Sequence, residues 1–527
     1  MSYQSLFFLI FTAAALLVYY AVPYKVQPWV LTAASILFYL SAGAKYLPFI
    51  AVTLICTYLC GLIIGRIYER SDILLSQCQD TAQKKEIRNT AKKKAKRFLI
   101  LSLIISIGIL AVCKYTVFSI NNINKLLVLV KLPEITVFKM ILPLGISFYT
   151  FMAISYVLDI YWKRYKAEKN LLFYSAFLLY FPHVVQGPID RYNEFKDQIK
   201  NGVPISYKNL THGAQLALWG FFKKLVIADR LAIFVNKIFD EPDKFNASAL
   251  ILALAVYSIQ IYADFSGCID IVSGVSEAFG IKLRKNFNHP YFSRTMAEFW
   301  RRWHISLQEF FKDYVYFPVS ASAFTKKVKK KLKAKGLKRL EELFTSCFPI
   351  LIVWLITGIW HGAAWTFVIW GLFHAALLIG SQIFEPLFAK LTKLFKINTE
   401  NFGWYFLQMS RTYILCCIGR IFFRSQGIAS AFGIIKKILN DTSLSALVRY
   451  KASDFGLTVN DVRIMVISVI VLLIADILQE KMPLRETLAK QNIIFRWIII
   501  FAGLFAVIIF GVYGPGYDAS SFIYEKF

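Results

Sequence analysis

Long apolar runs, separated by short polar and basic stretches, set the pattern of this chain. About 20 mostly apolar residues are enough for one helix to cross the hydrocarbon core of a bilayer. The runs are continuous rather than alternating, which excludes a membrane β-barrel. We therefore predict an all-α fold, a polytopic membrane helical bundle of about 11–13 helices. The runs cover residues 6–22, 29–40, 48–64, 98–118, 141–162, 171–185, 216–235, 250–265, 348–361, 365–379, 406–423, 464–477 and 493–512.

The segment 280–318 interrupts this pattern. Aromatic, basic and polar residues are mixed there too densely for a helix surrounded by lipid. Irregular or short helical backbone at membrane depth is tolerated only where it is buried in protein or lines a wet cavity. We expect short re-entrant or interfacial helices here, around a central funnel or tunnel.

Composition decides how many domains to expect. A soluble chain of 527 residues would divide into several domains. With 57% hydrophobic residues and a mean hydropathy of +0.53, this chain instead predicts one membrane domain over residues 1–527. The first apolar run lacks a basic flank and a small-residue cleavage site, so we expect it to stay as a helix.

The net charge of +29 comes from basic clusters between the apolar runs, at residues 66–97, 163–169 and 282–339. Such clusters mark cytoplasmic loops. They predict a multi-pass protein of the plasma membrane with an extracytoplasmic N-terminus, which contacts membrane lipid and no nucleic acid. Within them, 66–97 and 321–340 are expected to be basic cytoplasmic segments, the first helical and the second on the membrane surface.

Other polar features of the chain predict less chemistry. Residues 193–207 and 239–247 are expected to be connecting loops. Eight cysteines are scattered without a CxxC pair, so we predict no metal and no redox site.

Two histidines lie where a membrane protein tolerates them least. His361 follows a nearly uninterrupted apolar run, and His304 lies in the aromatic and basic segment 299–317. Ionisable groups in such segments are costly and usually face an interior cavity. A neutral imidazole can act as a base near pH 7, and a hydroxyl needs such a base before it becomes a nucleophile. Both are candidate catalytic residues; on composition alone, a hydrogen-bonded structural histidine is the favoured interpretation of His361.

Cationic side chains beside His304 suit a phosphate-bearing donor. Arg301, Arg302 and Lys312 can contact phosphates, and a positive-inside loop explains them equally well. Asp264 ends an apolar run and needs a partner; an ion pair is favoured over holding a histidine tautomer. The same two roles are open to Asp313, and an ion pair is again favoured.

Aromatic and amide side chains complete the set of substrate-binding candidates. Trp360 offers an apolar wall with an indole donor, and Trp303 is included with it. Asn288 and Asn286 either contact substrate or form a turn. The residues Gly358 and Gly362 allow close approach of a ligand or another helix. The remaining histidines are expected to be packed or interfacial: His183, His212, His289 and His374.

Several segments resemble one known family. They are 141–164 (ILPLGISFYTFMAISYVLDIYWKR), 181–191 (FPHVVQGPIDR), 262–318 (with DFSG and FWRRWHISL), 357–370 (TGIWHGAAWTFVIW) and 513–524 (YGPGYDASSFIY). Together they are similar to the membrane-bound O-acyltransferase family, in its bacterial branch typified by alginate O-acetylase. The resemblance places the family core at 141–374 and further helices at 400–527.

That resemblance implies an O-acyltransferase. It implies transfer of an acyl group, acetyl above all, from a cytoplasmic thioester (acyl-CoA or acyl carrier protein) to a hydroxyl of an extracytoplasmic polysaccharide or of a partner protein. It places the signature histidine on His361 and the second family histidine on His304. It also implies a membrane-anchored, hydrolase-like partner and no bound cofactor.

Two alternatives stay open. One is D-alanyl transfer to teichoic acid from a carrier-protein thioester, which chain length disfavours. The other is a transporter or flippase of lipid-linked saccharides. Transporter folds usually contain internal repeats, and we find no matching halves in the sequence.

Overall fold

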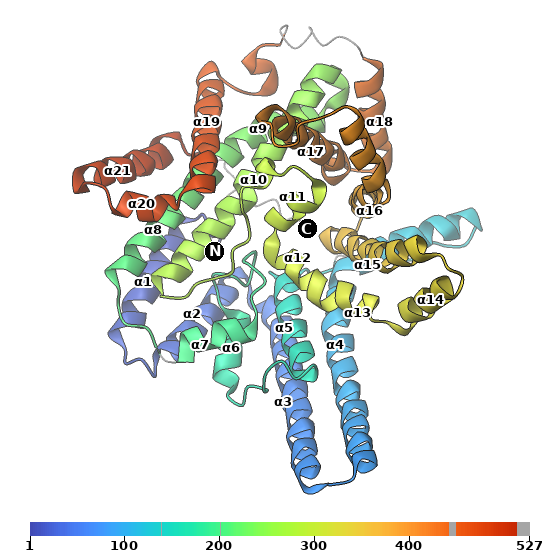
Figure 1. Cartoon of the computed structure of the whole chain (residues 1–527). Helices are drawn as coiled ribbons and strands as arrows, with labels where there is room; N and C mark the ends of the chain where they lie inside the picture. The colour runs from blue at the N-terminus through green and yellow to red at the C-terminus, as the bar shows by residue number, and fades with distance from the viewer. Residues whose placement is uncertain (139, 201, 442–449, 514–527) are drawn as a thin grey trace. The chain divides into compact units, whose positions relative to one another are not determined.

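The chain folds almost entirely as α-helices, as Figure 1 shows. The computed structural model describes every residue except 139, 201, 442–449 and 514–527. Among the described residues, the one β-type pairing recorded is an isolated bridge between Phe287 and Trp303. The all-α prediction is confirmed. The closing motif 513–524 lies outside the described residues except for Tyr513.

The chain divides into two compact units. The first unit consists of Met1–Ala214 and Val272–Arg284, and the second of Gln215–Ile271 and Lys285–Phe527. The division passes through α8 (Tyr207–Phe221) and α10 (Ala247–Ala278). The predicted central funnel or tunnel and the single domain remain predictions.

A long helical hairpin is the main feature of the first unit (Figure 1). It pairs α3 (Leu47–Gln77) with α4 (Thr81–Leu129), and the Asp80 side chain caps the start of α4 by accepting from two backbone N–H groups. At about 1.5 Å per residue, both α3 and α4 are longer than the hydrocarbon core of a bilayer is thick. The basic segment 66–97 lies on this hairpin and is helical on both sides of a break at 78–80, so its predicted helicity is confirmed.

The other helices of the first unit correct two predictions. The segment 193–207, expected to be a loop, contains the helix α7 (Tyr192–Lys200), which buries Tyr192, Phe195 and Ile199 along one face. The apolar run 171–185 is helical only in α6 (Leu171–Leu179), because Pro182 follows closely and favours a turn. The other helices are α1 (Leu6–Ala21), α2 (Gln27–Ala42) and α5 (Ile146–Tyr161).

The second unit is built around a hydrophobic core from α9, α10, α11, α16 and α17. Three short helices follow α10 along the chain: η4 (Pro290–Phe292), α11 (Met296–Arg302) and α12 (Ile305–Phe311). These match the expected short helices within 280–318. The other elements are η2 (Phe222–Ala228), α9 (Asp229–Asp240), η5 (Lys312–Tyr316), α13 (Phe317–Ser320), α14 (Ala323–Ala334), α15 (Lys338–His361), α16 (Trp365–Leu394), α17 (Phe402–Arg424), α18 (Ile428–Asn440), α19 (Val459–Lys481), α20 (Leu484–Ala489) and α21 (Ile493–Phe510).

The helices α15 and α16 pack so closely that glycines of each helix lie against the backbone of the other. A Cβ added to Gly358 would lie 2.5 Å from the carbonyl oxygen of Phe367, and one on Gly371 would lie 2.4 Å from that of Trp354. Real Cβ atoms do not approach backbone this closely, so only glycine fits at both positions. The predicted close approach at Gly358 is therefore to another helix.

Six helices of the described chain are long and apolar enough to cross a membrane. They are Ala44–Gln77, Thr81–Leu129, Ala247–Ala278, Lys338–His361, Trp365–Leu394 and Ile493–Phe510, and α1 and α5 are shorter apolar helices. The predicted run 216–235 is helical but contains the π-helical turn η2 with buried Lys223 and Lys224. The segment carrying His304 lies outside all six spans.

Candidate active site

His361 is the last residue of α15. The next residue, Gly362, is extended with φ −171°, and a Cβ there would lie 2.2 Å from the Phe367 ring. The His361 side chain is buried, and its ring faces the Trp370 ring at 4.8 Å and the Phe423 ring at 5.4 Å between centroids. The end of α15 therefore places the His361 imidazole in an aromatic enclosure formed by Trp370 and Phe423.

His304 lies at the junction between α11 and α12. Its backbone is left-handed, with φ 47° and ψ 52°, a conformation that costs energy for a residue other than glycine. Backbone hydrogen bonds hold this turn: the N–H of Asn288 donates to the carbonyl of Arg302, and the N–H of Ile305 donates to that of Asn286. Two chain segments thus brace the strained histidine.

The side chain of Asn286 fixes the orientation of the His304 ring. Its Oδ1 accepts from the backbone N–H of Ser306 at 3.0 Å and from the Ser306 hydroxyl at 2.9 Å, and it lies 3.2 Å from His304 Nδ1. A backbone N–H can only donate, so this amide atom is the oxygen. His304 Nδ1 must then carry the proton, which leaves the lone pair on Nε2 in the neutral ring.

Burial keeps this imidazole uncharged. His304 is 1% exposed. Loss of hydration lowers the pKa of His304 to about 3, far below its usual value. A neutral ring with its proton fixed on Nδ1 can accept a hydrogen bond at Nε2 near pH 7.

The structure brings both predicted histidines close to one indole ring. Trp360 lies 6.1 Å from the His304 ring and 4.8 Å from the His361 ring, between centroids. Trp360 is itself buried. Fifty-seven sequence positions separate the two histidines, so their proximity is a product of the tertiary fold.

Asp264 is held in a buried ion pair. Lys224 Nζ lies 2.6 Å from Asp264 Oδ1 and 2.8 Å from Asp229 Oδ1. A buried carboxylate requires such compensation. The partner is a lysine on the η2 turn. Asp313 lies half-buried on η5.

The three candidate cations have different environments. Arg302 forms ion pairs with Glu298, at 3.1 Å, and with Glu480 of α19, and it also donates to the carbonyl of Asn288. These contacts already neutralise its charge. Arg301 and Lys312 are exposed, and Arg301 lines an open pocket of about 390 Å³ together with Arg294 and Glu298.

The two remaining predicted residues have structural contacts. Asn288 Oδ1 accepts from Lys285 Nζ at 2.8 Å. The amide that contacts His304 belongs instead to Asn286. Trp303 is buried and stacks on Phe299 at 5.5 Å. The sequence left Asn286 open between a turn and a contact; its link to His304 spans 18 positions, which no local pattern reveals.

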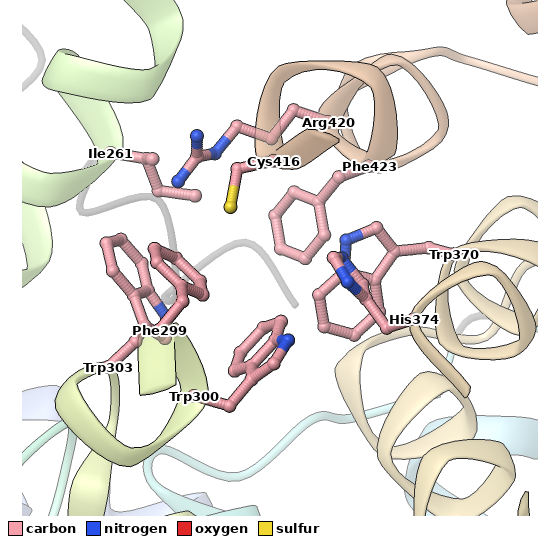
Figure 2. Close-up of a pocket in the computed structure, with 9 residues that line it drawn as sticks. All are labelled: Ile261, Phe299, Trp300, Trp303, Trp370, His374, Cys416, Arg420 and Phe423. Atoms are coloured by element: carbon pink, nitrogen blue, oxygen red, sulfur yellow. The ribbon is translucent and has the colours of Figure 1, made fainter. Parts of the chain in front are cut away.

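A small cavity adjoins the His361 enclosure (Figure 2). Its volume for a water-sized probe is about 20 Å³, close to the space of one water molecule. Arg420 and Cys416 of α17 face Phe299 and Trp303 across it. The full lining is Ile261, Phe299, Trp300, Trp303, Trp370, His374, Cys416, Arg420 and Phe423. Arg420 lies inside the apolar run 406–423, and no sequence pattern distinguishes it as a functional residue.

Comparison with known sequences now decides the family. A sequence model of MBOAT, the membrane-bound O-acyltransferase family, matches residues 168–335, a range that contains His304 and ends before His361. The peptidoglycan O-acetyltransferase of Helicobacter pylori is 31% identical over 471 residues, which cover 82% of this chain and 78% of that protein. The chain belongs to the membrane-bound O-acyltransferase family.

Other members of the family are similar over shorter ranges. The probable alginate O-acetylase AlgI of Pseudomonas syringae is 33% identical over 336 residues, covering 64% of this chain but only 59% of the relative. The teichoic acid D-alanyltransferase of Bacillus subtilis is 32% identical over 280 residues, covering 52% of this chain and 67% of that protein. The resemblance predicted from the motifs is confirmed, and this membrane protein is an O-acyltransferase.

Proposed function

We propose that the protein transfers an acetyl group from a cytoplasmic thioester to a hydroxyl of an extracytoplasmic polysaccharide. The observation that carries this proposal is the pair of buried histidines about Trp360 in a chain of this family. The O-acetylating relatives from Helicobacter and Pseudomonas support the choice of acetyl and of a polysaccharide acceptor. A membrane-anchored, hydrolase-like partner that completes delivery is part of the proposal.

In the proposed mechanism His361 acts as the base. It removes the proton of the acceptor hydroxyl as the oxygen attacks the thioester carbonyl. The new C–O bond forms, the C–S bond breaks, and the proton passes to the leaving thiolate. The aromatic enclosure excludes water, which strengthens any stabilisation of the tetrahedral oxyanion.

His304 has a different proposed role. Its proton is held on Nδ1 by Asn286, and its ring stays neutral because it is buried. We assign it to orienting the acceptor hydroxyl through Nε2. Arg301 and Lys312, the two exposed cations, are assigned to donor phosphates; Arg302 is assigned to holding the turn, because its charge is already paired.

D-alanyl transfer to teichoic acid is the second candidate, favoured by the similarity to the Bacillus enzyme over half of the chain. The test is a membrane preparation that contains the intact protein, supplied with radiolabelled acetyl-CoA or D-alanyl carrier protein. Label appearing in base-labile polysaccharide only with acetyl-CoA, and disappearing with His361→Ala at equal protein level, is the expected result. Undiminished transfer by that variant overturns the proposal, and saccharide movement without covalent change would support a transporter instead.

The proposed location is the bacterial plasma membrane with the N-terminus outside. The basic hairpin between α3 and α4 supports a cytoplasmic position for residues 66–97. A cysteine-labelling reagent that cannot cross the membrane tests this orientation. Because Cys78 lies at the break of that hairpin, it should react in inverted vesicles and not in intact cells.

A further inference from the structure

Arg420 is a buried cation at the cavity beside His361. It is 6% exposed. Its guanidinium donates to the Ser258 hydroxyl and, at 2.9 Å, to the Tyr291 hydroxyl, and it lies 5.6 Å from the centres of the Tyr291 and Trp303 rings. All of these partners are uncharged.

No carboxylate in the described part of the chain lies within ion-pair distance of Arg420. Its neighbour one turn later on α17 shows the contrast: Arg424 is paired with Asp240 at 3.1 Å. A buried charge without a counter-charge is costly. The wall of this cavity therefore carries one uncompensated positive charge.

Two further polar groups line the cavity. Trp300 Nε1 and His374 Nδ1 are buried at its lining and have no hydrogen-bond partner within the residues that the structure describes. The indole N–H is a donor only. An oxygen atom or an anion therefore suits Trp300 Nε1, whereas an ammonium group does not.

The cavity is one aromatic ring away from the proposed base. Trp370 and Phe423 line the cavity and also contact the His361 ring. A reacting carbonyl must lie about 3–3.5 Å from the attacking oxygen. The group attached to that carbonyl is thus confined close to these two rings and to the charged wall behind them.

We propose that Arg420 determines which acyl groups are transferred, by the sign of their charge. The site accepts small acyl groups that are neutral, such as acetyl, and rejects acyl groups that carry an ammonium, such as aminoacyl groups. This inference rests on the proposed function. Two positive charges on the order of 10 Å apart in a partly dry site repel by enough to lower the rate about tenfold.

The experiment compares two acyl groups of equal size and different charge. Propionyl and glycyl groups have the same number of heavy atoms, and only glycyl carries an ammonium. Each is supplied to the full-length protein in detergent as its CoA thioester and as its pantetheine thioester, and kcat/KM is measured. The native protein should prefer propionyl at least tenfold, Arg420→Gln should reduce that preference about tenfold, and Arg420→Lys should preserve it.

The matched control is Arg424→Gln, which removes an equal charge one turn away and should leave the preference unchanged. An unaltered ratio in Arg420→Gln overturns the inference. If that variant does not fold, equal use of propionyl and glycyl by the native protein still overturns it. Transfer of no acyl group to any hydroxyl overturns the proposed function, so the two failures can be told apart.

Discussion

His304 and His361 are both buried and both contact aromatic rings, but the described contacts of the two rings differ. The His304 ring is oriented through hydrogen bonding by the Asn286 amide on a strained left-handed turn. The His361 ring ends a helix and lies among Trp360, Trp370 and Phe423. A ring fixed in one protonation state suits orientation of a substrate. The imidazole at the end of α15 is the one that we propose as the base.

Removing each imidazole in turn tests whether the two histidines have different roles in catalysis. We expect His361→Ala to lower kcat for acetyl transfer about 1000-fold, because it removes the base. His304→Ala should lower it about 10- to 100-fold, because it removes an orienting group. The measurement is labelled-acetyl transfer by purified protein at saturating donor and acceptor.

The double variant tests whether the two side chains act in one step. Residues that act as a unit are not additive, so the double variant should be close to His361→Ala. His212→Ala, in the first unit, serves as the control for the loss of a histidine. A larger loss at His304 than at His361 would reverse the two roles.

The packing beneath His361 can be broken without touching the ring. A Cβ at Gly371 meets the Trp354 carbonyl oxygen, so Gly371→Ala must push α15 away from α16. We expect a loss of about 1–3 kcal/mol in stability and a fall in activity, because α15 carries His361. Gly380→Ala is the matched control on the same helix, since nothing lies within 4 Å of its added Cβ. Melting temperatures in detergent that fall equally in both variants would contradict the packing argument.

The hydrogen bonds beneath His304 can be broken separately. Asn286→Ala leaves the N–H of Ser306 buried without its acceptor, which costs about 1–3 kcal/mol, and it releases the ring of His304. We expect activity to fall about tenfold through kcat. Asn286→Asp keeps an acceptor oxygen and should retain more activity. Asn288→Ala, which loses only a contact from Lys285, should resemble the native protein; an equal loss there would show that Asn286 has no special role.

The sequence predicted the features that depend on the residue pattern within a short stretch of chain. The apolar runs predicted an all-α membrane fold, the mixed segment 280–318 predicted short helices, and residue chemistry identified both histidines. These features rest on composition within a few turns of chain. The helix α7 was missed because its apolar face is only three residues wide.

Contacts between distant segments could not be predicted in this way. The sequence left Asn286 open between a substrate contact and a turn, and its bond to His304 depends on pairing between 286–288 and 302–305. Arg420 lies within the predicted apolar run 406–423, and its isolation from carboxylates is a property of the packed core. Asp264 was expected to be paired, but its partner on the π-turn η2 was not foreseeable from spacing.

The last prediction concerns how the stability of the folded protein depends on pH through His304. In the folded protein the pKa of His304 is lowered to about 3, while in the unfolded chain it is about 6.5. Between these values the unfolded chain binds the extra proton, so stability contributed by the neutral ring is present above pH 6.5 and is lost as pH falls. The loss is at most about 1.4 kcal/mol per pH unit. His304→Gln should therefore show a smaller drop in melting temperature between pH 7 and pH 5 than the native protein. An equal drop in both would mean that the buried imidazole takes up its proton without unfolding, and the contrast with His361 would then have to rest on geometry alone.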